Sequence, residues 1–172
     1  MSDSHSRPII LVGFMGAGKT TVGKVLARRL EYAFVDLDEV IEARAGLSVR
    51  EIFAEFGESE FRRRESEAIE GCRGLTDVVV ALGGGAYVAD ENRRVAREIG
   101  KTIWLDCPLK VCLARLGSDP TRPRLGSEPE MSALLERRRS SYAMADYSVN
   151  TGDCTPEDAA TEILKVLDLS AG

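Results

Sequence analysis

A glycine-rich segment near the start of the chain constrains the fold more than any other feature. Residues 13–20 read GFMGAGKT and directly follow a short apolar run, PIILV, at 8–12. The spacing matches the pattern GxxxxGK[ST], which needs a strand before it and a helix after it. Glycines at these positions let backbone N–H groups turn inward around phosphate oxygens, and the helix N-terminus adds its dipole. The segment therefore predicts a phosphate-binding loop between a strand and a helix.

Apolar runs and helical patterns alternate along the rest of the chain. We expect strands at 8–12, 33–38, 77–82, 101–106 and 147–150, and helices at 19–31, 38–72 (interrupted at Gly57), 90–98, 109–116, 130–145 and from Thr155–Pro156 onward. Continuous apolar strands that alternate with helices predict an α/β fold with a parallel sheet covered on both faces. Ligands of such sheets bind at the carboxyl ends of the strands.

Composition limits the class of protein. A length of 172 residues fits one domain over 1–172, and 44% hydrophobic residues suffice for a core. The net charge of −5 disfavours a nucleic-acid partner. No apolar run approaches the roughly 18–20 residues that span a bilayer, and the first residues, MSDSHSRP, lack the features of a signal peptide. We therefore expect no membrane partner and a cytoplasmic, monomeric protein.

The cysteine and histidine content narrows the chemistry. The four cysteines form no CxxC pair, which favours reduced thiols over a zinc site or disulfides. The single histidine is His5, in the leader, so acid–base chemistry must fall to carboxylates, lysine or water. The Asn-Lys-x-Asp motif expected of a GTPase is absent. The chain therefore reads as a small-molecule kinase, with Lys19 reaching the β- and γ-phosphates and Thr20 binding Mg²⁺.

Charged residues outside the loop point to the phosphate acceptor. Asp36 and Asp38 end the second expected strand two residues apart, so we expect both carboxylates on one face beside the loop, although strand-end aspartates also cap helices. Glu65 lies within an apolar stripe, with Arg62 within reach three residues earlier. Arg138 interrupts a second apolar stripe. These arginines suggest an anionic acceptor, the alternatives being a solvated face for Arg62 and snorkelling for Arg138.

Two glycine-containing segments complete the predicted site. Residues 83–85, all glycine, follow the third expected strand and would let a small molecule approach the backbone closely. The segment at about 117–129 contains Arg122 and Arg124 among prolines and glycines. A loop of this length is often a lid, and a lid arginine could stabilise charge on the transferred phosphate. A solvated loop with incidental arginines is the alternative.

In this order and spacing, the motifs resemble the shikimate kinase family over about residues 8–168. The matching pieces are GFMGAGKTT, DLD at 36–38, FRRRE at 61–65, GGG at 83–85, TRPRL at 121–125 and RRSSY at 138–142. The resemblance implies ATP-dependent phosphorylation of the 3-hydroxyl of shikimate in aromatic amino-acid biosynthesis. It also implies a nucleoside-monophosphate-kinase-like three-layer fold with five parallel strands in the order 2-3-1-4-5, substrate-binding helices at about 38–72 and a lid at 117–129.

The resemblance implies a role for each matched position. The implied nucleotide-binding residues are Gly16, Ala17, Gly18, Lys19, Thr20, Thr21, Arg115, Arg122, Thr155 and Pro156. Those implied for shikimate are Asp38, Arg62, Glu65, Gly84, Gly85 and Arg138. Thr20 and Asp36 are implied for Mg²⁺, and Lys19, Asp38 and Arg122 for catalysis, with Asp38 as the candidate base. Arg115 is implied to stack on adenine, with Thr155 and Pro156 as a wall.

One departure and two rival functions accompany this interpretation. Arg124 stands where the family usually has the first leucine of Arg-Pro-Leu-Leu, which affects the packing of the lid. A gluconate kinase would share the phosphate loop and an anionic acceptor. A catalytically silent relative that acts as a regulator should have lost Lys19, Asp38 or Arg122, and all three are present.

Overall fold

The computed structural model describes residues 6–117 and 126–169, which build one five-stranded sheet. Its strands are β1 (Ile9–Val12), β2 (Ala33–Asp36), β3 (Val78–Ala81), β4 (Lys101–Asp106) and β5 (Tyr147–Asn150). The order across the sheet is β2-β3-β1-β4-β5, and every neighbouring pair is parallel. The predicted α/β fold and strand order are therefore confirmed.

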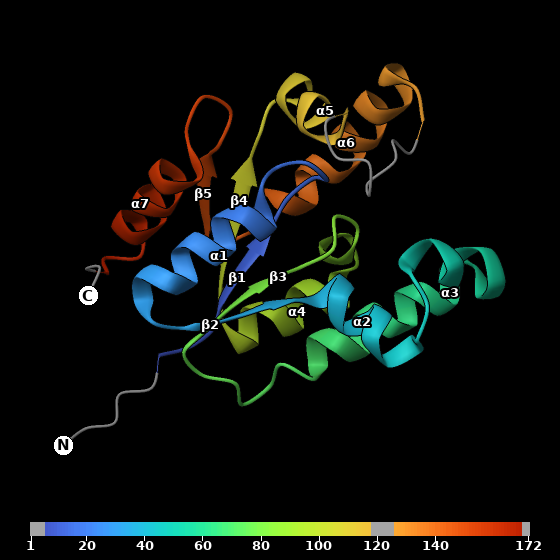
Figure 1. The fold of residues 1–172 in the computed structure, drawn as a ribbon, viewed down its shortest axis with the longest axis horizontal. Helices are drawn as coiled ribbons and strands as arrows, with labels where there is room; N and C mark the ends of the chain where they lie inside the picture. The colour runs from blue at the N-terminus through green and yellow to red at the C-terminus, as the bar shows by residue number, and fades with distance from the viewer. Residues whose placement is uncertain (1–5, 118–125, 170–172) are drawn as a thin grey trace.

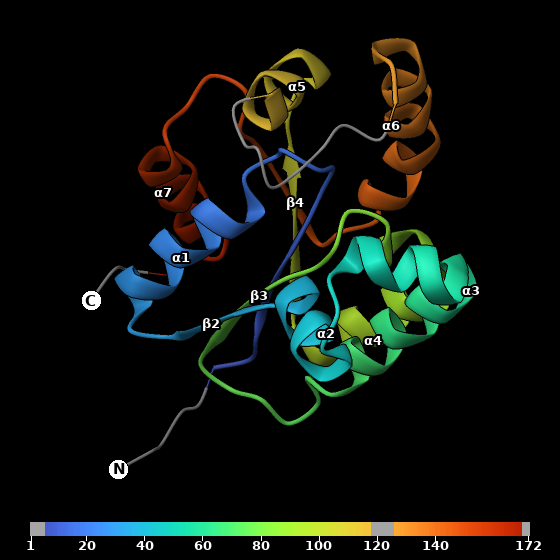
Figure 2. The same ribbon diagram turned by 45° about the vertical axis from the view of Figure 1, so that its right-hand side comes forward.

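Helices follow the strands as the alternation predicted. They are α1 (Lys19–Leu30), α2 (Leu37–Ala45), α3 (Val49–Glu70), α4 (Asp90–Ile99), α5 (Leu109–Gly117), α6 (Glu128–Tyr142) and α7 (Pro156–Val166), with a short 3₁₀ helix, η1, at Ala86–Val88. Helices α1 and α7 pack together on one side of the sheet, and α4 lies on the other side beside α3 (Figures 1 and 2). Helices α5 and α6 lie beyond the carboxyl end of β4 (Figure 1).

The register of the central strands decides where the site forms. Both β1 and β3 are buried along their whole length, as strands covered on two faces must be. Leu11 of β1 and Asp36 of β2 both pair with Ala81 of β3. The three strands therefore end level with one another. The phosphate loop, Asp36 and the glycine triplet at 83–85 consequently meet at one edge of the sheet.

Local signals in the sequence act at several helix ends. Ser48 and Glu51 form a capping box at the start of α3, and Thr155 forms one with Asp158 before α7. Gly57 has a φ of 83° and kinks α3 where the sequence predicted an interruption. The kink separates the first turns of α3 from the part that carries Arg62 and Glu65.

The expected strand at 33–38 is two residues too long, and this corrects one step of the sequence argument. Asp36 ends β2 and caps α2, because its side chain accepts a hydrogen bond from the Asp38 backbone N–H at 3.0 Å. Asp38 is therefore in the first turn of a helix, and strand alternation does not orient it. The two carboxylates still face one site, because the helix begins directly at the edge of the sheet.

The expected lid falls largely outside the described residues. Arg122 and Arg124 lie in the segment 118–125, between the two described ranges. At its borders, Gly117 belongs to α5 and Glu128 begins α6, so residues 117, 128 and 129 of the expected lid are helical. Across residues 6–117 and 126–169, no helix combines the length and apolar character that a bilayer span requires.

Candidate active site

The phosphate loop is held in shape by its own backbone and by α5. Lys19 Nζ donates to the carbonyl oxygens of Gly13 and Phe14 at 2.7 and 2.9 Å, so the ammonium group lies across the loop. Gly16 has a φ of 78°, and a Cβ atom there would lie 2.6 Å from the Cys112 carbonyl oxygen. Only glycine fits both the backbone conformation and this close approach.

Two oxygen groups at the base of the loop suit a magnesium ion. The Thr20 hydroxyl donates to Asp36 Oδ2 at 2.8 Å, which joins the start of α1 to the end of β2. Mg²⁺ prefers oxygen ligands and is usually held by one or two protein groups, with substrate phosphates and water completing its shell. The described residues contain no group of three or more potential metal-binding side chains. The oxygen atoms of the Thr20–Asp36 pair fit the partial set of protein ligands that Mg²⁺ takes.

The glycine triplet at 83–85, together with Ala86, forms what we call the acceptor turn, and charged groups surround it. A Cβ atom on Gly83 would lie 2.8 Å from Asp38 Oδ1 and 3.0 Å from Glu65 Oε1. On Gly85 it would lie 2.6 Å from both terminal nitrogens of Arg62. Side chains on the turn would therefore displace these groups. Because Gly83 and Gly85 have no side chains, the carboxylates of Asp38 and Glu65 and the guanidinium of Arg62 lie directly beside the backbone.

Arg138 approaches the acceptor turn from α6 and closes the gap to the phosphate loop. A Cβ atom on Gly84 would lie 3.5 Å from Arg138 Nη1 and 3.4 Å from the Met15 backbone nitrogen. The guanidinium carbon of Arg138 lies 6.0 Å from the centre of the Phe14 ring. Arg138 Nη1 is buried, and no hydrogen-bond acceptor reaches it from residues 6–117 or 126–169. The guanidinium is therefore placed to receive an anion between the turn and the loop.

Glu65 is a buried carboxylate whose partner is Arg62. Its exposed fraction is 2%, and Arg62 Nη1 donates to Glu65 Oε2 at 2.5 Å. Burial raises the pKa of Glu65, and the charge of Arg62 opposes that rise. The contact predicted from the sequence spacing is therefore present. It fixes the direction in which Arg62 points toward the acceptor turn.

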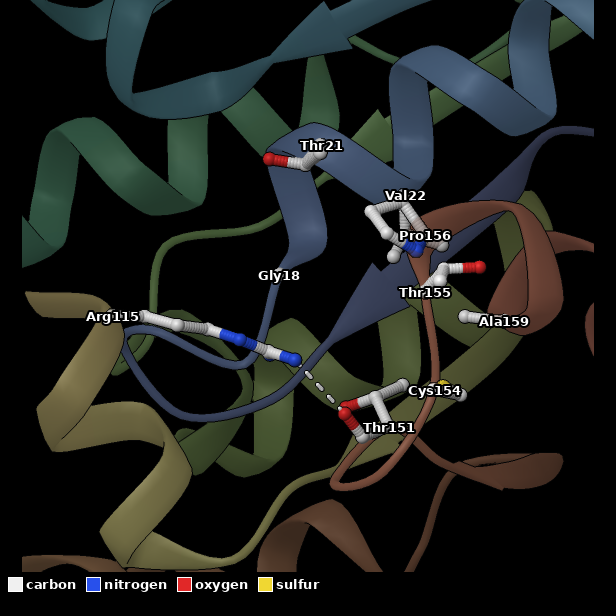
Figure 3. Close-up of a pocket in the computed structure, with 9 residues that line it drawn as sticks. All are labelled: Gly18, Thr21, Val22, Arg115, Thr151, Cys154, Thr155, Pro156 and Ala159. Atoms are coloured by element: carbon white, nitrogen blue, oxygen red, sulfur yellow. Dashed lines mark hydrogen bonds between the residues drawn. The ribbon is translucent and has the colours of Figure 1, made fainter.

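A cavity of about 170 Å³ opens beside the phosphate loop. Its lining residues are Gly18, Thr21, Val22, Arg115, Thr151, Cys154, Thr155, Pro156 and Ala159. Figure 3 shows Arg115 reaching across from α5 toward Thr151, with Thr155 and Pro156 on the facing wall. The cavity thus brings together five of the ten residues implied for nucleotide binding: Gly18, Thr21, Arg115, Thr155 and Pro156.

Arg115 is tied to the loop that it flanks. It donates to the carbonyl oxygens of Ala17 at 3.2 Å and Thr151 at 3.0 Å, and it lies 3.6 Å from Cys107 Sγ. The neighbouring Cys112 thiol lowers the pKa of Cys107, and Thr151 and the charge of Arg115 act in the same direction. Arg115 is therefore held flat along one side of the cavity.

Sequence reasoning missed three residues that shape this site. Tyr142 donates its hydroxyl to the Gly84 carbonyl, Asn92 donates to the Ala86 carbonyl, and Ser66 donates to Asn92. Burial raises the pKa of Tyr142 to about 12, so its hydroxyl stays protonated. Tyr142 lies four residues after Arg138, on the same stripe of α6, and it ends the matching piece RRSSY, so the sequence carried two signals for it. Asn92 and Ser66 look like ordinary helix-surface residues in the sequence.

Comparison with known proteins agrees with this geometry. A family model for shikimate kinase matches residues 15–168. A shikimate kinase from Geobacter sulfurreducens is 48% identical over 163 residues, which cover 93% of this chain and 90% of that protein. The chain belongs to the shikimate kinase family. The structure of the shikimate kinase from Acinetobacter baumannii, in complex with shikimate, is similar with a TM-score of 0.89 and 36% identity, covering 94% of this chain and 93% of that one.

The fold of this chain is shared with a gluconate kinase, but the similarity in sequence is low. A gluconokinase from Sinorhizobium meliloti matches with a TM-score of 0.61 but only 16% identity, covering 95% of this chain and 93% of that one. That likeness shows a shared fold and nothing about the acceptor. Membership of the shikimate kinase family therefore rests on sequence similarity over nearly the whole chain. The individual site roles remain predictions, and Arg122 lies outside the described residues.

The buried state of Glu65 predicts a pH dependence of stability. Because its pKa is raised in the folded protein, Glu65 favours folding most below its ordinary value of 4.5, and this contribution is lost as the pH rises through the raised pKa. Glu65→Gln removes the titration. We expect the free energy of unfolding of the variant, relative to the parent, to increase from about pH 4.5 to about pH 7. Urea unfolding across that range measures it.

A neighbouring glutamate on α3 provides the control. Hydrogen bonds from Arg63 and Arg64 lower the pKa of Glu60 to about 2, so Glu60 is already ionised above pH 4.5. Glu60→Gln should therefore give a difference that falls only slightly, as the unfolded glutamate completes its ionisation just above pH 4.5, and in the opposite sense to Glu65→Gln. A Glu65→Gln difference that does not rise would contradict a raised pKa for Glu65.

The position of Cys154 in the wall of this cavity predicts how a thiol reagent reacts with the protein. Cys154 is half-buried in that wall, while Cys72, Cys107 and Cys112 are buried. Burial raises the pKa of the Cys154 thiol, whereas that of Cys107 is lowered, but the reagent must reach the sulfur atom. We therefore expect iodoacetamide to modify the accessible Cys154 first, and saturating Mg·ADP to slow this reaction several-fold by covering the thiol. Peptide mass spectrometry identifies the site, and Cys154→Ser should remove the fast phase. Modification at the same rate with and without nucleotide would place the nucleotide elsewhere.

Proposed function

We propose that the protein transfers the γ-phosphoryl group of ATP to the 3-hydroxyl of shikimate, giving shikimate 3-phosphate and ADP, in aromatic amino-acid biosynthesis. One observation carries the proposal. The guanidiniums of Arg62 and Arg138 both lie against the acceptor turn, beside Asp38 and next to the phosphate loop. A small acid with a hydroxyl needs this arrangement, with cations for its carboxylate at one end and phosphate chemistry at the other.

Each group has a proposed task. Arg62, oriented by Glu65, and Arg138 bind the carboxylate, and the backbone of Gly84 and Gly85 contacts the ring of the acceptor. Asp38 orients the acceptor hydroxyl and takes its proton as the bond to phosphorus forms. The loop from Gly16 to Thr21 binds the phosphates, and Lys19 within it stabilises their negative charge. Arg122, in the expected lid, stabilises the negative charge on the transferred phosphoryl group.

A nucleotide and a metal ion complete the proposal. Arg115, Thr155 and Pro156 flank the adenine. Thr20 and Asp36 would hold Mg²⁺, which would neutralise charge on the phosphates. A single domain over 1–172, a monomeric state, a cytoplasmic location and the absence of nucleic-acid and membrane partners stay predictions from the sequence.

ADP release from Mg·ATP, measured in parallel with shikimate and with gluconate, tests the proposal. Release with shikimate alone is the expected result. Release with gluconate would support the phosphate chemistry but contradict the assignment of shikimate as the acceptor. Release with neither, from folded protein that still binds ATP, would favour the silent regulator.

The role of Asp38 gives a separate prediction. Asp38→Asn keeps the size of the side chain but cannot accept the hydroxyl proton, so we expect kcat to fall by at least ~100-fold. The KM for ATP should change little, because Asp38 faces Gly83 on the acceptor side. Steady-state kinetics with shikimate measures both. Near-normal turnover would mean that Asp38 is not needed for the proton.

A further inference from the structure

The acceptor turn is anchored from the α6 side by Tyr142. The Tyr142 side chain is fully buried, and its hydroxyl donates to the Gly84 carbonyl. Its ring centre lies 6.2 Å from that of Trp104 on β4, which restricts movement of the phenol. Tyr142 follows Arg138 by one helical turn. The helix that carries one acceptor-side guanidinium is therefore joined directly to the backbone beside it.

A second anchor, Asn92 of α4, joins the same turn to α3, the helix that carries Arg62. Asn92 of α4 has an exposed fraction of 4%, and its Nδ2 donates to the Ala86 carbonyl at 2.9 Å. Its Oδ1 lies 2.8 Å from the Ser66 hydroxyl, which also lies 3.1 Å from the Arg62 carbonyl oxygen. Ser66 is one turn after Arg62 on α3. The turn is thus linked through Asn92 to the helix that carries the second guanidinium.

The two arginines lie against neighbouring residues of the anchored turn. Arg62 lies against Gly85, and Arg138 lies against Gly84. Loss of either anchor lets the turn move relative to one helix. A carboxylate gripped by two guanidiniums depends on their spacing, because paired hydrogen bonds have a narrow geometry.

We propose that Tyr142 and Asn92 are positioning residues, which pin the acceptor turn from opposite sides and so fix the gap between the Arg62 and Arg138 guanidiniums for an acceptor carboxylate. The inference rests on the proposed function for the identity of that carboxylate. The anchoring of the turn by Tyr142 and Asn92 does not depend on the proposed function, because it concerns contacts within the protein. The two parts can therefore be tested separately.

The competing explanation is that both residues only satisfy buried polar groups and stabilise the fold. Tyr87 supplies a matched control for it. Its side chain is also fully buried, but its hydroxyl meets Thr102 Oγ1 at 3.4 Å and not the acceptor turn. Tyr87→Phe removes a buried hydroxyl just as Tyr142→Phe does. A purely structural role predicts similar effects from both.

Amide hydrogen exchange without substrate tests the anchoring. The N–H groups of Ala86 and Val88 donate to the carbonyls of Gly83 and Gly85 at 3.1 and 3.2 Å, so they report opening of the turn. We expect Tyr142→Phe and Asn92→Ala to speed their exchange by about tenfold, the loss of roughly one hydrogen bond. Tyr87→Phe should leave it within about twofold. Unchanged exchange in both anchor variants, or equal acceleration in Tyr87→Phe, would overturn the anchoring.

Steady-state kinetics tests the consequence for the acceptor. In Tyr142→Phe we expect the KM for shikimate to rise about tenfold while kcat and the KM for ATP change less than about threefold, because carboxylate binding alone is weakened. The preference for shikimate over its methyl ester should fall by a similar factor. Equal changes in both KM values, a loss confined to kcat, or the same result in Tyr87→Phe would overturn the positioning role.

The parent protein separates this inference from the proposed function. If it releases no ADP with shikimate, the proposed function fails, and the exchange measurement still decides whether the turn is anchored. If it is active and the variants show faster exchange with unchanged KM for shikimate, the function stands and the positioning inference fails. Tyr142→Phe and Asn92→Ala act at different contacts, so a folding defect in one leaves the other as the test.

Discussion

The bare backbone of Gly83–Gly85 is the constraint on which the acceptor half of the site depends. Asp38, Glu65 and Arg62 occupy space that side chains on Gly83 and Gly85 would need, and Arg138, from a third helix, lies in contact distance of Gly84. The turn begins where β3 ends, level with β1 and β2, so the same register that buries the strands brings it against the phosphate loop. Phosphate and acceptor chemistry therefore share one edge of the sheet.

Burying charge beside this turn has a cost that the ion pair partly offsets. Glu65 is almost fully buried, and desolvation raises its pKa while the charge of Arg62 is the largest influence that opposes this rise. Arg62 remains partly exposed and turned toward Gly85. A buried carboxylate is a poor source of stability but a precise means of aiming a guanidinium, and the site uses it for that purpose.

Most of the fold could be predicted, because its signals are local. Apolar runs of strand length, capping boxes at Ser48 and Thr155, and the break at Gly57 act over a few residues each. The strand order came from the family resemblance and not from these signals. The error at 33–38 has a physical cause. The Asp36 side chain ends the strand by capping the next helix, which is the alternative that the sequence left open for strand-end aspartates.

For the site, the sequence by itself determined which charged and glycine residues are present and that Arg62 and Glu65 are neighbours, because residues three apart on a helix always meet. Only the tertiary structure decided that Arg138 faces the same turn as Arg62, that Arg115 lies along the phosphate loop, and that Tyr142 and Asn92 hold the acceptor turn. These contacts join residues far apart in the chain. They depend on how helices pack across the end of the sheet, which no local pattern encodes.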